Sequence, residues 1–540
     1  MENDERSTAR RDFGEKVTHQ ADLLPISASG MRLGSPEALP SPKRPPVTPP
    51  IRCQPRPGPA WWAPAAILAV AGALAYANSL RGPFLLDDAW NIVRNPSLRH
   101  LGQLGNVLSP PANLGVAGRP LYNLSFALNY AAGGTAVLGY HLVNGLIHLL
   151  AALALFGIVR RTLRGRLEEP TPVALAIAGL WLLHPVQTAS VTYISERSES
   201  LMGLFYLLTL YCFIRHAEPA AADARRWGWL AVLACLAGTA TKEVMVTAPI
   251  LVLLYDRTFL AGDFGSALRQ RPAVYAGLAC SWILLVYLMA GSHEQGVGFG
   301  LGASAWNYAL TECRALTHYL RLAVWPHPLV FDYDLALDQR WSAVAGDSLL
   351  LAAALAVSLL ALWRWPAIGF VACSFFLLLA PTSSFVPVAG QPLAENRLYL
   401  PLAALLTLLV LGLRRGPKRW IDPLLLALAL LAAGLTYRRN RDYASDLTIW
   451  RDTVAKCPAS PRAHSNLGVA LFRHGDKAAA RAEVAEAVRL RPGNALNRLL
   501  FGNLLAEAGQ IPEAVAQYRE AVRADPNLLP AREALQRLAP

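Results

Sequence analysis

Long apolar runs separated by short polar breaks fill the chain between Trp62 and Tyr437. An apolar run of roughly 20 residues crosses a bilayer as a helix, because lipid offers no hydrogen-bond partner to an open backbone. Charged residues make up 16% of the chain, against about 25% in soluble proteins. The pattern predicts an all-α, polytopic membrane protein with about eleven transmembrane helices. It excludes a chain built only of soluble domains.

The predicted membrane domain covers residues 61–437 and has long outer loops at 81–137 and 291–347. Residues 1–60 are polar and Pro-rich, which predicts a disordered tail and not a cleavable signal peptide. The apolar runs begin near Trp62, Leu138, Val173, Leu201, Trp227, Val244, Ala273, Ser348, Ala367, Leu398 and Leu424.

Lysine and arginine gather in loops that follow every second predicted span. All of these loops lie on one side if the charged stretch Trp306–Trp325 forms an interfacial helix instead of a span. The positive-inside rule then predicts a cytoplasmic N-terminus and an outer C-terminus. The net charge of +13 follows from these loops, so it does not indicate nucleic acid as a partner. Arg438, Arg439 and Arg441 are the exception, because they follow the last span on the outer side.

Residues 446–540 repeat with a period of 34, as Pro458, Pro492 and Pro526 show. Gly468 and Gly502 have the same spacing. This period, with small residues inside helices and a glycine at each turn, is typical of tetratricopeptide repeats (TPRs). The pattern predicts two full repeats, a preceding half repeat and a capping helix. Such a stack has a concave face that binds a protein or an extended peptide, here the expected acceptor.

Polar residues gather on the predicted outer face, which indicates an extracytoplasmic site. Asp87 and Asp88 are candidate general bases, and their mutual repulsion is expected to raise their pKa. The same pair could instead cap a helix or hold a divalent cation. The candidate cations for a lipid phosphate are Arg119, Lys242 and Arg397. The additional site candidates are His184, Glu196, Arg197, Glu199, Glu243, His327 and Glu395.

Each of these clusters has a structural alternative. Glu196 and Glu199 could begin a solvated helix, and Lys242 and Glu243 could form a simple ion pair at the end of a span. His141, Asn144 and His148 share one helix face, where a hydrogen-bonding stripe is favoured over a metal site. The chain has seven cysteines but no CxxC pair, so no zinc site is indicated. Metal binding is otherwise left open, and no cofactor is assigned.

Together, a base and several cations suit glycosyl transfer from a polyprenyl-phosphate sugar. A carboxylate would take the proton of an acceptor hydroxyl, and the cations would stabilise the departing phosphate. A one-step attack of this kind inverts the anomeric centre. The alternative is a catalytically inactive, membrane-anchored TPR scaffold. A transporter ranks last, because the middles of the apolar runs lack charges.

Several blocks resemble the TMTC family, the transmembrane and tetratricopeptide repeat-containing O-mannosyltransferases. They are LDDAWNIVRNPSLRH, GRPLYNLSFALNY, GYHLVNGLIHLL, LLHPVQTASVTYISERSESL, TKEVMVTAPILVLLYD, HYLRLAVWPHPLVFDYD and AENRLYLPL. The resemblance implies a GT-C glycosyltransferase fold and a polyprenyl-phosphate donor, with mannose as one candidate sugar. It also implies that Asp87 and Asp88 lie at the catalytic centre and that a Ser or Thr hydroxyl of a protein is the acceptor. The alanine- and arginine-rich composition favours a bacterial inner membrane, with the repeats in the periplasm.

Overall fold

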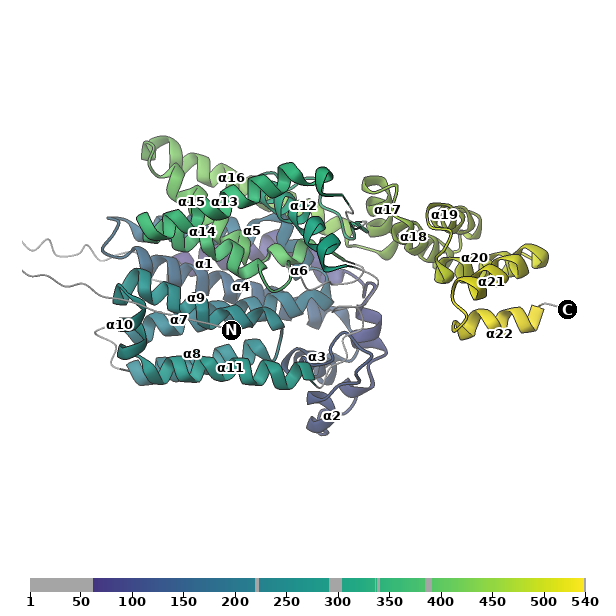
Figure 1. The fold of residues 1–540 in the computed structure, drawn as a ribbon, viewed down its shortest axis with the longest axis horizontal. Helices are drawn as coiled ribbons and strands as arrows, with labels where there is room; N and C mark the ends of the chain where they lie inside the picture. Colours follow the sequence, from purple (N-terminus) through teal and green to yellow (C-terminus); the bar gives the residue numbers. More distant parts are fainter. Residues whose placement is uncertain are drawn as a thin grey trace, which may run out of the picture. The chain divides into compact units, whose positions relative to one another are not determined.

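The computed structural model describes residues 62–218, 223–290, 304–335, 337, 340–383 and 391–538. In these ranges the chain forms helices joined by turns and contains no β-strand (Figure 1). The all-α fold is thereby confirmed. The predicted tail 1–60 and residues 291–303 of the second outer loop lie outside the described residues.

A helix lies close to each predicted span start. Seven helical segments of the described chain are long and apolar enough to cross a membrane, or eight if the bent pair Pro170–Leu183 and Pro185–Val191 is one span. The chain is a multi-pass membrane protein, while the number of crossings stays a prediction. The helices are α1 (Trp62–Tyr76), α4 (Val137–Leu163), α5 (Pro170–Leu183), α7 (Arg197–Ala217), α8 (Ala224–Thr239), α9 (Ala248–Asp256), α11 (Pro272–Ala290), α13 (Ala345–Arg364), α14 (Pro366–Leu379), α15 (Pro401–Leu413) and α16 (Lys418–Asp442).

The membrane helices differ in how much of their apolar surface other helices cover. The protein buries 67% of the most apolar stretch of α7. In α13 and α16 only 17% of the corresponding stretch is buried. Large apolar side chains such as Ile283, Leu349 and Leu430 are therefore exposed on the outer helices. Water would not tolerate so much apolar surface, so these faces are the ones that contact lipid.

Short helices between the spans carry the polar clusters. In the first loop, α2 (Leu104–Leu108) and α3 (Pro120–Gly133) pack in one apolar cluster with residues of the short helix η2 (Ala89–Val93). Before α7 lie α6 (Thr188–Val191) and η5 (Ile194–Glu196), and before α15 lies η9 (Glu395–Leu398). The stretch predicted to be interfacial is a separate helix, α12 (Ala305–Val324).

The C-terminal part forms antiparallel helix pairs, as the 34-residue period predicted (Figure 1). Gly475 and Gly509 have φ values of +88° and +78°, a backbone conformation that glycine adopts without strain. These two residues make the turn inside each repeat. The repeat helices are α17 (Asp446–Lys456), α18 (Pro461–Arg473), α19 (Lys477–Leu490), α20 (Ala495–Glu507), α21 (Ile511–Ala524) and α22 (Leu529–Leu538).

The first repeat helix shares an apolar core with the loops of the membrane domain. Trp450 of α17 lies in one buried cluster with Leu85, Tyr193 and Tyr443. The Phe331 ring contacts the rings of Tyr193, Tyr443 and Trp450 at centroid distances of 5.1, 5.8 and 5.3 Å. The repeats are thus packed against the loops and are not attached through a bare linker.

Ion pairing explains one member of the arginine cluster that stood against the predicted topology, Arg439. Arg439 is buried, and its guanidinium lies 3.0 Å from Asp442 and 2.7 Å from Asp452 of α17. Arg441 lies over the Tyr437 ring. Arg439 therefore connects α16 to the repeats, a structural role that is independent of the positive-inside bias.

The repeat glycines give a stability prediction. A Cβ atom at Gly502 would lie 2.6 Å from the Tyr518 ring, so Gly502→Ala is expected to cost about 1–3 kcal/mol through overpacking. A Cβ at Gly493 meets nothing within 4 Å, so Gly493→Ala is the matched control. Hydrogen exchange of the full-length protein should show faster exchange in α20 and α21 for Gly502→Ala only. Equal protection in the two variants would contradict this packing.

Candidate active site

Asp88 is buried and connects the first outer loop to the start of α7. Its carboxylate accepts hydrogen bonds from the backbone N–H of Leu85 at 2.8 Å and of Ser195 at 2.7 Å. The Ser195 hydroxyl donates a third. The side chain does not cap the short helix η2 that follows it. Asp88 is therefore an anchoring residue whose lone pairs are largely engaged by protein donors.

Asp87 lies beside this anchor but its side chain reaches solvent. Its carboxylate accepts a hydrogen bond from the Tyr193 hydroxyl at 2.9 Å, and its backbone N–H donates to the same hydroxyl at 3.0 Å. Asp87 also lines a small polar cavity. Of the two adjacent carboxylates, Asp87 is the one that is exposed to solvent.

The cavity brings together carboxylates from distant parts of the sequence. Asp87, Glu196, Asp332 and Glu395 all line it. Glu196 accepts a hydrogen bond from the Asn396 amide at 2.5 Å, and Glu395 accepts one from the Tyr333 hydroxyl at 2.9 Å. The recess therefore gathers four acidic side chains, and cations already act on three of them: Arg462 on Asp332, Lys242 on Glu196 and Arg439 on Glu395.

The environment of each aspartate changes its acidity. Burial raises the pKa of Asp88 to about 7, although the hydrogen bonds from Ser195 and Leu85 act in the opposite direction. Loss of hydration also raises the pKa of Asp87, while the Tyr193 hydrogen bond and the Arg462 charge lower it. The sequence predicted raised values from mutual repulsion. The direction is the same, but burial is the larger cause.

Lys242 lies next to the acidic recess and pairs with Glu199. Its ammonium is 2.5 Å from the Glu199 carboxylate, and both side chains are largely buried. Burial lowers the pKa of Lys242, but the charges of Glu199, Glu196 and Glu243 raise it above its usual range. Lys242 therefore stays protonated, and its charge acts on Glu196, which lines the cavity.

Arg119 pairs with Glu243 at 3.2 Å, so Lys242 and Glu243 take different partners and do not form the simple pair that their adjacency suggested. Arg119 begins α3, and Glu243 begins the short helix η6 (Glu243–Thr247). Both side chains keep part of their surface exposed, 19% for Arg119 and 32% for Glu243. Of the three predicted phosphate-binding cations, Arg119 is the most accessible.

Arg397 is fully engaged by the protein. Its guanidinium lies 3.4 Å from Glu312 of α12 and donates to the backbone carbonyls of Pro392 at 2.9 Å and Gln391 at 2.6 Å. Because Gln391 lines the acidic cavity, Arg397 fixes one of its walls. This position explains the buried charge at the start of an apolar helix, and it makes Arg397 a positioning residue.

Arg197, His184 and His327 do not line the cavity. Arg197 is fully buried, and its guanidinium donates to the side chains of Asn144 and Asn129, both at 2.6 Å. His184 is buried and caps the helical turn that follows it, and His327 is exposed on the outer loop. The structure therefore places these three predicted site residues outside the recess.

The polar stripe of α4 joins helices, as its spacing predicted. His141 is hydrogen-bonded to the Gly82 carbonyl at 2.9 Å, and Asn144 donates to the Val191 carbonyl at 3.1 Å. The His148 ring contacts the Tyr399 hydroxyl at 2.9 Å. Among the described residues, no group of three His, Cys, Asp or Glu side chains could hold a metal ion.

The first repeat reaches the edge of the recess. Arg462 of α18 forms an ion pair with Asp332, and its charge acts on Asp87. The Ser460 hydroxyl donates to Asp334 at 3.1 Å, and the Lys456 ammonium donates to the Leu329 carbonyl at 2.8 Å. One end of the repeat stack therefore borders the candidate site.

Sequence reasoning did not identify Tyr193, Ser195, Asn396 or Arg462 as site residues. Tyr193 and Ser195 directly precede Glu196, so their position in that block was an available signal. Arg462 gave no such signal, because the residues around it in the sequence all belong to the tetratricopeptide repeats.

The fold and the site define a multi-pass membrane protein with C-terminal tetratricopeptide repeats and an acidic recess bordered by cations. The tetratricopeptide repeat family matches residues 431–495, which confirms the repeats. The curated relatives confirm the TMTC resemblance. Protein O-mannosyl-transferase F38B6.6 of Caenorhabditis elegans is 25% identical over 78% of this chain and 61% of its own length. Protein O-mannosyl-transferase Tmtc1 of Drosophila melanogaster is 25% identical over 74% and 58%.

The chain thus spans about six tenths of the length of these relatives. Among solved structures, ArnT from Cupriavidus metallidurans bound to undecaprenyl phosphate matches with a TM-score of 0.40 and 16% identity. The match covers 85% of this chain and 80% of ArnT.

The placement of Arg197 gives a prediction about folding. Arg197→Ala would leave buried amide and carbonyl acceptors without a donor, so it is expected to cost on the order of 3 kcal/mol or more. Arg94→Ala, which removes an exposed guanidinium over Trp90, is expected to have little effect. Thermal unfolding of the two purified variants in detergent measures the difference. Equal melting temperatures would mean that the buried hydrogen bonds of Arg197 do not stabilise the fold.

Proposed function

We propose that the protein is a membrane glycosyltransferase that transfers a sugar, with mannose as the first candidate, from a polyprenyl phosphate to a protein Ser or Thr hydroxyl. The observation that carries the proposal is the solvent-exposed Asp87 carboxylate in an acidic recess, where the charge of the nearby Lys242 acts on Glu196. The two curated relatives named above are O-mannosyl-transferases by name, which supports the same reaction class.

Asp87 is the proposed general base. In its ionised form it takes the proton of the acceptor hydroxyl as the oxygen attacks the anomeric carbon, and the bond to the donor phosphate breaks. The Tyr193 hydroxyl and the Asp88 anchor orient it. A raised pKa makes the ionised Asp87 carboxylate a stronger base than that of a free aspartate. Attack from the side opposite the phosphate inverts the anomeric centre.

Lys242 and Arg119 are the proposed partners of the donor phosphate. The leaving phosphodiester is a weak base, so it needs positive charge more than a proton. Each cation already has a carboxylate partner, which keeps the pair neutral overall before the donor arrives. Arg397 acts indirectly by holding the Gln391–Pro392 segment at the cavity wall.

The repeats are proposed to deliver the acceptor. Their first helices contact the loop that carries Asp332, and Arg462 borders the recess. A peptide on the concave face could therefore continue into the site. The cavity holds only about 30 Å³, close to the volume of one water molecule, so donor and acceptor enter only when the surrounding loops separate.

This proposal depends on the predicted topology. The recess and the repeats lie on the outer side, which is the periplasm if the host is bacterial, and the N-terminus lies in the cytoplasm. The competing function is an inactive TPR scaffold, which the protein contacts of the repeat stack would also suit. The scaffold predicts that Asp87 is dispensable.

Asp87→Asn removes the base but keeps the size of the side chain. Transfer is expected to fall by about 10²- to 10⁴-fold with unchanged thermal stability and donor binding. The matched control is Asp263→Asn, since Asp263 caps α10 (Phe264–Gln270) and asparagine caps helices equally well. Radiolabel transfer to acceptor protein in proteoliposomes measures the effect. Full activity of Asp87→Asn would remove Asp87 from the mechanism.

Arg462→Gln is expected to shift the pH dependence of transfer. The Arg462 charge lowers the pKa of Asp87, so its loss raises that pKa further. As the pH falls, Asp87 would then take up its proton earlier, at a higher pH. The acidic limb of the pH–activity profile would therefore shift to higher pH. Arg491→Gln, which removes a contact to Asp334 at the same junction, is the control. Identical acidic limbs for wild type and Arg462→Gln would contradict the coupling.

Lys242→Ala and Arg119→Ala are each expected to weaken donor binding by roughly tenfold or more, the effect of losing one charge-assisted contact of about 1.5–3 kcal/mol. Binding of labelled polyprenyl phosphate to the purified protein measures this. Arg94→Ala, an exposed arginine of the same outer face, is the control. Unchanged affinity in both variants would assign the two cations a structural role.

A further inference from the structure

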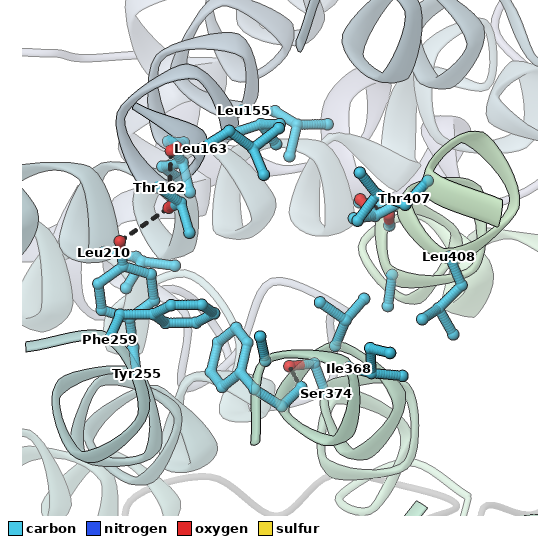
Figure 2. Close-up of a pocket in the computed structure, with 18 of the residues that line it drawn as sticks. Leu155, Thr162, Leu163, Leu210, Tyr255, Phe259, Ile368, Ser374, Thr407 and Leu408 are labelled. Atoms are coloured by element: carbon cyan, nitrogen blue, oxygen red, sulfur yellow. Dashed lines mark hydrogen bonds between the residues drawn. The ribbon is translucent and has the colours of Figure 1, made fainter. Parts of the chain in front are cut away.

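A second and larger cavity lies among the membrane helices. It has a volume of about 500 Å³ and is lined by residues of α4, α7, α9, α14 and α15 (Figure 2). The volume falls in the range of small-molecule and lipid sites. Figure 2 shows Leu155, Leu210 and Leu408 around the opening.

The wall of this cavity suits an apolar chain. Its few polar side chains are satisfied within the protein: Thr162 is hydrogen-bonded to Tyr255 at 2.7 Å, and Ser374 donates to the Phe370 carbonyl at 2.7 Å (Figure 2). The cavity follows α15 from Leu400 to Arg415, and this helix of 13 residues is about 20 Å long. An apolar space that extends along a helix matches a hydrocarbon chain better than a sugar or a peptide.

Two arginines lie at one end of the cavity, Arg166 and Arg415. The Arg166 guanidinium donates to the backbone carbonyls of Thr162 at 2.6 Å and Phe259 at 3.2 Å. In the described part of the chain, neither arginine has a carboxylate partner, and both are exposed.

Some other cations of the same loops form ion pairs. Arg414 lies 2.5 Å from Asp422, and Lys418 lies 3.0 Å from Glu169. Arg161 pairs with Glu218 at 3.1 Å. The cavity therefore ends at two positive charges that the protein leaves without a counter-ion in the described chain, a condition that favours an anion.

The larger cavity is separate from the candidate active site. The described residues that line it include none of those that line the acidic recess. Arg166 and Arg415 also lie in the loops that the positive-inside rule places in the cytoplasm, on the membrane face opposite Asp87. A ligand with its anionic group at these arginines would thus not be the reacting donor.

We infer that this cavity binds an anionic phospholipid of the cytoplasmic leaflet, with one acyl chain between α4, α14 and α15 and the phosphate between Arg166 and Arg415. Anionic lipids give the inner membrane surface its negative potential, which basic residues near the surface attract. The bound acyl chain would fill the space between these helices, where their side chains do not contact one another.

The test uses the full-length protein purified in detergent, with phosphatidylglycerol and phosphatidylcholine as probes and native mass spectrometry as the readout. Wild type should retain phosphatidylglycerol at least tenfold better than phosphatidylcholine. The double variant Arg166→Gln, Arg415→Gln should lose this preference. Arg164→Gln, Arg419→Gln changes the charge of the same loops by the same amount outside the cavity, and it should keep the preference. Equal retention of the two lipids, or equal loss in both double variants, would overturn the inference.

A filling variant tests the position of the acyl chain. A Cβ atom at Gly412 meets nothing within 4 Å, and Gly412 lines the cavity, so the side chain of Gly412→Leu should occupy part of the space proposed for the acyl chain. Retention of phosphatidylglycerol should fall at least tenfold while the melting temperature is kept. Unchanged retention would place the lipid elsewhere. Displacement of phosphatidylglycerol by polyprenyl phosphate at equal concentration would assign the cavity to the donor chain and overturn the proposal.

Discussion

The buried Asp88 carboxylate holds the first outer loop against the start of α7, and the candidate site depends on that contact. A carboxylate removed from water is costly unless donors replace its hydration. Leu85 and Ser195 supply three of them. With Asp88 turned inward, the next side chain in the turn, Asp87, extends into the recess beside Tyr193. The structure thus gives two adjacent, chemically identical residues different environments: Asp88 is buried among donors, and Asp87, the proposed base, is exposed to solvent.

The free-energy cost of burying a charge also explains the ion pairs in the rest of the outer face. Lys242, Arg397 and Arg439 each lie at or near the end of an apolar helix, and each has a carboxylate partner within 3.4 Å. These pairs connect elements that are distant in the sequence: α7 with the turn after α8, η9 with α12, and α16 with the first repeat. The recess lies among them, so its polar wall is also the junction between the membrane helices and the repeats.

Hydropathy and the 34-residue period are local signals, which is why the helices and the repeats could be predicted from the sequence. The separate roles of Asp87 and Asp88 could not, because Ser195 lies 107 positions away from Asp88. Arg197 looked like an accessible cation for the same reason. Its burial depends on Asn144 and Asn129, which reach it only in the folded helix bundle. Arg462 approaches the site from another domain, and no pattern within the repeat marks it.

The most direct test of the account is transfer of labelled sugar from a polyprenyl-phosphate hexose to a protein acceptor by the wild-type protein in liposomes, with donor and acceptor on the outer side only. The account predicts labelled protein in which the sugar is bound to a Ser or Thr oxygen with the anomeric configuration inverted relative to the donor. Absence of transfer with every polyprenyl-phosphate hexose, from a protein that still binds the donor, would contradict it and favour the scaffold.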